Sequence, residues 1–126
     1  MPESYTIDVD RDAGVINVNY RGEITADDIQ AAVERSWRLA TDTRLFRFLN
    51  DFQRARVPLS GFDILSILEP WNTIGINKET RSAIVVSNFG QLLEYAQLHQ
   101  SLAAAHTGNV KLFVDRDRAQ EWLTLP

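Results

Sequence analysis

The sequence predicts a single α/β domain over residues 1–126, with the element order β-β-α-β-α-β-α-β-α and a mostly parallel sheet. Three observations support this fold class. Alternation of apolar and polar residues near the N-terminus indicates an antiparallel hairpin, and three later apolar runs indicate inner strands. Helical spacing of apolar residues fills the segments between and after those runs. The length of 126 residues and the 44% hydrophobic content suit one domain with one core.

The hairpin and the first helix account for the N-terminal third of the chain. Residues 5–9 and 16–20 alternate between apolar and polar side chains, with a turn at 12–14 between them. Thr25 then suits an N-cap, because two aspartates follow it in the first turn, where the helix dipole favours carboxylates. Apolar residues at helical spacing predict a helix over 26–40, which the polar run 41–43 is expected to end.

The remaining elements alternate between strand and helix. Inner strands are predicted at 45–52, 82–87 and 110–114, each short and mainly apolar. The second helix is expected to begin at Ser60 and to end at Pro70, because proline cannot donate the interior hydrogen bond. The third begins at Asn88 and runs to about residue 106, and the fourth follows an Asp115 N-cap. Arg54 and Arg56 are assigned to a loop.

Composition and motifs exclude several kinds of function. The chain has no cysteine, and its two histidines lie seven residues apart on one predicted helix, about 10 Å, so we expect no metal site. The net charge of −4 disfavours nucleic-acid binding. No signal sequence or membrane span is evident, which predicts a cytoplasmic protein. No nucleophile elbow, phosphate loop or distinctive carboxylate pair is present, so we expect neither a cofactor nor an enzyme.

The C-terminal segment 109–123 carries a family resemblance. Its strand, acidic cap and helix contain Phe113, Asp115, Ala119, Trp122 and Leu123 in an order that resembles the last strand and helix of SpoIIAA-like proteins. These proteins are small bacterial members of the STAS (sulfate transporter and anti-sigma-factor antagonist) superfamily. The resemblance implies a STAS/SpoIIAA-like fold with four helices. It also implies a non-enzymatic regulatory or protein-interaction domain whose partner is a kinase or another regulator.

The same resemblance implies a phosphorylation site. In anti-sigma-factor antagonists the phosphorylated serine precedes a glycine at the start of the helix after the third strand, and here Ser60 and Gly61 occupy that place. Pro58 and Leu59 stand where the family has Asp-Ser. Phosphate at a helix N-terminus would meet free backbone N–H groups, with Arg54, Arg56 and Gly61 as the expected anion or partner contacts. An ordinary N-cap role for this serine is the alternative interpretation.

Four arginines flank the predicted third strand. Arg44, Arg47, Arg54 and Arg56 could form an anion or partner pocket at its carboxyl end, where open α/β sheets bind ligands. Pairing with nearby aspartates is the other interpretation.

The second predicted helix has apolar residues around more than one face. A helix that packs on a sheet needs only one apolar face. The additional apolar residues indicate a surface for a protein partner or for a small apolar ligand such as a lipid. The residues assigned to that surface are Phe62, Ile67, Trp71 and Ile74. Alternatively, the loop 71–76 folds back over them. A homodimer through the hairpin or this helix is a further possibility.

Overall fold

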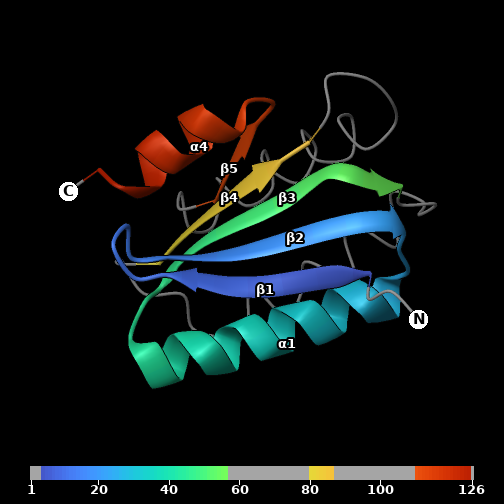
Figure 1. Ribbon diagram of the computed structural model, residues 1–126, viewed down its shortest axis with the longest axis horizontal. Helices are drawn as coiled ribbons and strands as arrows, with labels where there is room; N and C mark the ends of the chain where they lie inside the picture. Colours follow the sequence, from blue (N-terminus) through green and yellow to red (C-terminus); the bar gives the residue numbers. More distant parts are fainter. Residues whose placement is uncertain (1–3, 57–79, 87–109, 126) are drawn as a thin grey trace.

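The computed structural model describes residues 4–56, 80–86 and 110–125, which build a five-stranded sheet with a helix on each face (Figure 1). The strands lie side by side in sequence order. β1 is antiparallel to β2, and the other strands are parallel to their neighbours. The elements are β1 (Tyr5–Asp10), β2 (Val15–Glu23), α1 (Ala26–Thr43), β3 (Arg47–Arg56), β4 (Arg81–Val85), β5 (Val110–Phe113) and α4 (Arg116–Leu123). The predicted hairpin and mostly parallel sheet are confirmed. The second and third predicted helices lie outside the described residues.

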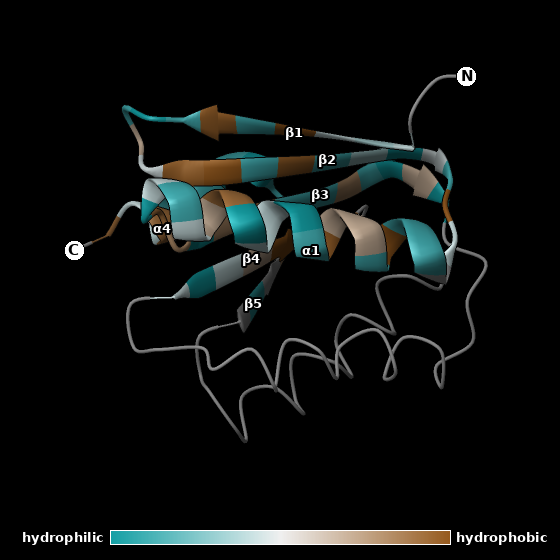
Figure 2. Ribbon diagram, turned by 90° about the horizontal axis from the view of Figure 1, so that it is seen from below, coloured by the Kyte–Doolittle hydropathy of each residue, from teal (hydrophilic) through white to brown (hydrophobic). Residues whose placement is uncertain are grey.

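The hairpin closes through the turn that the sequence predicted. The Gly14 N–H donates to the Asp10 carbonyl at 2.8 Å, and the Ala13 N–H donates to the Asp10 carboxylate at 3.1 Å. Gly14 has φ 71°, a left-handed conformation that glycine adopts without steric cost. The turn sets β1 at one edge of the sheet, with β5 at the other (Figure 2).

α1 begins as predicted but continues beyond the predicted end. The Thr25 hydroxyl accepts from the Asp28 N–H, and the Asp28 carboxylate accepts from the Thr25 N–H, which makes a reciprocal capping box. The predicted end at residue 40 is wrong. The hydroxyls of Thr41 and Thr43 donate to carbonyls four residues earlier, so these side chains are satisfied within the helix. The helix stops at Arg44, whose φ of 59° is left-handed.

β3 is shifted toward the C-terminus relative to the predicted strand at 45–52. It includes Arg54 and Arg56, so their assignment to a loop is wrong. The strand continues because its backbone pairs with the end of β2, where Gly22 is the partner of Ala55, and the Ile24 N–H donates to the Arg56 carbonyl. β4, β5 and α4 fall within about two residues of their predicted positions. Asp115 caps α4 as expected.

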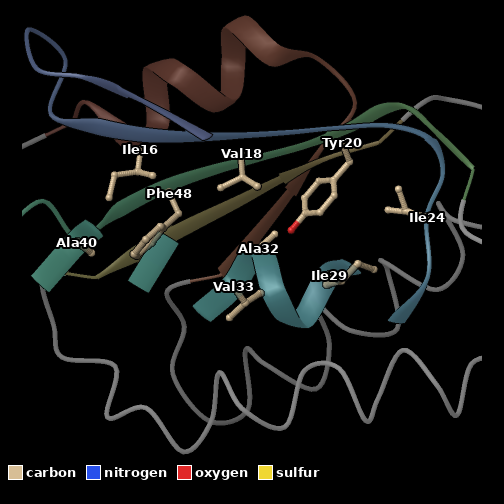
Figure 3. Close-up of a cluster of buried hydrophobic side chains, with 9 residues drawn as sticks. All are labelled: Ile16, Val18, Tyr20, Ile24, Ile29, Ala32, Val33, Ala40 and Phe48. Carbon is tan, nitrogen blue, oxygen red and sulfur yellow. The ribbon is translucent and has the colours of Figure 1, made fainter. Parts of the chain in front are cut away.

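Each face of the sheet has its own apolar cluster. The first core lies between the sheet and α1, and Figure 3 shows its buried members, Ile16, Val18, Tyr20, Ile24, Ile29, Ala32, Val33, Ala40 and Phe48. The second core lies under α4 and contains Val15, Leu49, Ala83, Val85, Ala119 and Leu123. β3 supplies Phe48 to one core and Leu49 to the other, because successive side chains of a strand point to opposite faces.

Burial of Tyr20 in the first core makes the stability of the fold depend on pH in the alkaline range. Its side chain is 3% exposed and its ring stacks on Phe52 at 4.2 Å. Burial raises the pKa of the Tyr20 phenol above its ordinary value, and the neighbouring Tyr5 raises it further. Above about pH 10 the unfolded chain therefore releases a proton that the folded chain retains. The stabilising contribution is complete below pH 10 and is lost as the pH rises above it.

We therefore expect Tyr20→Phe to flatten the alkaline stability profile. Urea unfolding between pH 8 and about pH 11 should show the original protein losing up to about 1.4 kcal/mol per pH unit, above pH 10, relative to the variant. The comparison uses slopes, so a constant stability difference between the two proteins does not matter. Parallel profiles would contradict the assignment.

Candidate functional site

The residues proposed from the sequence divide into two groups. The four arginines are described: Arg44 follows α1, and Arg47, Arg54 and Arg56 lie in β3. Six others lie outside the described residues: Ser60, Gly61, Phe62, Ile67, Trp71 and Ile74. The apolar surface of the second predicted helix therefore remains a prediction from the sequence, as does its alternative role as a small-ligand site.

Arg54 and Arg56 form a basic end to β3. Arg54 and Arg56 are exposed, and within the described parts of the chain their guanidinium groups have no hydrogen bond or ion pair. In the register with β2, Arg54 is the partner of Arg21 and Arg56 is the partner of Glu23. This end of β3 is its carboxyl end, the edge at which parallel sheets usually bind ligands.

A β-bulge determines which way these arginines point. The register between β2 and β3 slips so that one residue of β2 lies opposite both Phe52 and Gln53. Phe52 packs against the first core, so strict alternation would direct Arg54 and Arg56 to that buried face. The extra residue, Gln53, reverses the alternation. Ala55 then packs against the first core, and both arginines point to the opposite side.

The four arginines that flank β3 do not form one pocket. Arg47 and Arg56 are the two ends of a ten-residue strand, roughly 30 Å apart. Arg44 precedes β3, at the end of α1. The hypothesis of a single four-arginine pocket is therefore wrong, because a strand separates residues that a compact loop would have brought together. Figure 1 shows the two ends of β3 on opposite sides of the molecule.

Arg47 has a structural partner that the sequence did not reveal. Its Nη1 donates to the Leu123 carbonyl and, at 3.0 Å, to the Leu125 carbonyl. Arg81, the register partner of Arg47 on β4, donates to the carbonyls of Trp122 at 3.0 Å and Leu125 at 2.7 Å. The last carbonyls of a helix lack partners within the helix and carry its negative dipole end. The two guanidinium groups therefore hold α4 on the sheet.

A polar network at the other end of α4 was also missed. Arg116 contacts Asp51 at 2.6 Å and the side-chain oxygens of Asn19 at 2.8 Å and Asn17 at 3.4 Å. Both asparagines donate to Asp8 at 3.4 Å. The alternation of β1 and β2 predicted a polar face, but not that an arginine from α4 would cross it. The network joins three strands to the start of α4, and both of its carboxylates have partners.

The described residues offer no arrangement for metal chemistry. Residues 4–56, 80–86 and 110–125 contain no group of three or more histidine, cysteine, aspartate or glutamate side chains placed to hold an ion. In the same ranges, neither helix combines the length and the apolar composition that a bilayer crossing requires.

Comparison with known proteins gives the fold its name. No family model matches the chain, and the curated proteins contain no match either. Among solved structures, the chain is similar to an uncharacterised protein of the DUF3478 family from Shewanella loihica PV-4, whose crystal structure has a SpoIIAA-like fold. The two chains share 20% identity and a TM-score of 0.52, over 94% of this chain and 91% of the other. The predicted SpoIIAA-like fold is thus confirmed, and at this identity the similarity concerns the fold alone.

Proposed function

We propose that this chain is a non-enzymatic regulatory domain of the STAS type. In this role it binds a protein partner at the carboxyl end of β3, and phosphorylation of Ser60 changes that binding. The observation that carries the proposal is the pair of exposed arginines, Arg54 and Arg56, that ends β3 four residues before this serine. The SpoIIAA-like fold supports the same role, since it suggests a STAS-like domain.

Chain geometry limits how far the serine can lie from the arginines. Four residues of fully extended chain span at most about 14 Å between Cα atoms, so Ser60 stays within that distance of Arg56. A phosphoserine carries a charge of about −1.5 to −2, and the planar guanidinium group suits phosphate oxygens. Because Arg54 and Arg56 have no ion-pair partner in the described part of the chain, they are available for such a contact.

The first experiment asks whether Ser60 is phosphorylated. The purified full chain is incubated with a lysate of its source organism and labelled ATP, and the label is located by mass spectrometry. We expect Ser60→Ala to reduce incorporation roughly tenfold or more, because it removes the acceptor hydroxyl. Ser66→Ala, six residues further along, is the matched control and should keep full labelling. Equal labelling of Ser60→Ala and the original chain would contradict the proposal, as would the absence of any labelling.

The arginines provide a second measurement. If they contact the phosphate, Arg54→Gln together with Arg56→Gln should leave the phosphorylated serine more accessible to a phosphatase. Arg38→Gln changes one charge on the exposed face of α1 and should leave dephosphorylation unchanged. Equal dephosphorylation rates in the original chain, the double variant and Arg38→Gln would show that Arg54 and Arg56 do not contact the phosphate.

A further inference from the structure

An open hollow lies at the opposite end of β3 from the proposed phosphorylation site. Its volume is about 370 Å³, and it is lined by Ala13, Gly14, Arg44, Leu45, Phe46 and Arg47. These residues come from the β1–β2 turn, from the connection between α1 and β3, and from Arg47 at the start of β3. Figure 1 shows both connections at the same end of the molecule.

The backbone at each connection explains how the hollow is built. Gly14 and Arg44 both have left-handed φ values, 71° and 59°, so the chain reverses sharply at each of them. A Cβ at position 14 would be 3.8 Å from Leu45 Cδ2, an ordinary contact distance. The β1–β2 turn and the α1–β3 connection therefore lie close together at Leu45.

The lining combines positive charge with apolar surface. Arg44 is exposed, and in the described ranges its guanidinium group has no hydrogen bond or ion pair. Arg47 uses Nη1 for the end of α4 and keeps its full positive charge beside the hollow. Leu45 and Phe46 are half-buried, and Phe46 is packed against Trp37 with ring centroids 5.7 Å apart. The nearby Asp10 carboxylate accepts from its own turn.

We propose that this hollow binds a small organic anion with an apolar body. The carboxylate of the ligand would meet Arg44, and its ring or short chain would lie against Leu45 and Phe46. A volume of about 370 Å³ is at the small end of the range for ligand pockets, which suits a mono- or bicyclic aromatic acid better than a long-chain lipid. The site is separate from Ser60, so each proposal can fail without the other.

An NMR titration of the full chain with 2-naphthoate tests the proposal. We expect saturable shifts of the backbone amides of Gly14, Leu45 and Phe46 at millimolar ligand. Arg44→Gln should weaken binding about fivefold, the size expected for one charged contact at a partly exposed site. Arg38→Gln removes an equivalent charge from α1 outside the hollow and should bind as the original chain does. Arg44→Lys, which keeps the charge, should recover part of the loss.

The uncharged analogue 2-naphthamide distinguishes the contribution of the charged lining residues to binding from that of the apolar ones. It should bind several-fold more weakly than 2-naphthoate, because it lacks the carboxylate. Equal affinity for the two ligands would show apolar binding only and would overturn the proposal. Shifts confined to other parts of the chain, an absence of saturable binding, or equal weakening by Arg44→Gln and Arg38→Gln would also overturn it.

Discussion

Truncation of Phe48 to alanine should lower the free energy of unfolding by about 3–5 kcal/mol. Phe48 is fully buried at the middle of the first core, and its ring stacks on Trp37 with centroids 5.9 Å apart. The substitution removes the apolar burial of the ring and leaves a cavity between β3 and α1. The helix and the sheet cannot move together enough to close that cavity completely. The β2–α1 connection fixes the start of α1, and its other core residues fix the rest of the helix.

Phe46→Ala is the matched control for this prediction. Phe46 also contacts Trp37, but it is only half-buried and precedes β3. Its truncation should cost less than half as much, because the lost ring was partly in water and solvent can fill the space. Guanidinium chloride unfolding of the two variants measures both values. Equal losses would show that Phe48 does not occupy the centre of the core.

The fold was largely predictable because most of its elements are specified by residues that are close together in the sequence. The alternation in β1 and β2, the turn glycine and the capping residues Thr25 and Asp115 each act over a few residues. Such signals are visible in one sequence without knowledge of what is packed nearby. The errors occurred where a local signal was ambiguous. The sequence pattern predicted that Thr41 and Thr43 end the helix. Their hydroxyls instead donate to backbone carbonyls one turn earlier in the same helix.

The end of β3 shows a second reason for error. Alternating arginines after a core strand resemble a polar loop, and nothing local reveals that β2 continues beside them. The bulge at Gln53 is what allows Arg54 and Arg56 to remain in the strand and still point away from the core. The sequence pattern could have shown this, because omission of Gln53 restores regular alternation from Phe52 to Arg56.

The arginines also show why the candidate site was only partly predictable. Sequence reasoning grouped Arg47 with Arg54 and Arg56 because they are close in the chain. Its actual partner, the carbonyl of Leu125, is 78 residues away. Arg116 similarly contacts Asp51 across 65 residues. A charged side chain can pair with any opposite dipole that the fold brings near, so its role follows from topology, which charge spacing does not encode.

Replacement of both Arg47 and Arg81 by methionine should cost about 3 kcal/mol and loosen α4. The two guanidinium groups donate to the carbonyls of Trp122, Leu123 and Leu125, and methionine keeps much of the apolar stem while it removes those donors. Both arginines donate to the Leu125 carbonyl, so each single variant leaves that carbonyl one partner. The double variant should therefore cost more than the sum of the two single variants.

Amide hydrogen exchange distinguishes this local effect from general destabilisation. Exchange in α4 should accelerate more than exchange in β2 and α1, because the helix loses the side-chain donors at its C-terminal end and is then held by the second core and by the Arg116–Asp51 ion pair. Arg118→Met is the matched control, since Arg118 is exposed on the same helix and its guanidinium has no partner in the described ranges. It should change stability by less than about 0.5 kcal/mol. If the double variant behaves like this control, the two arginines do not hold α4 on the sheet.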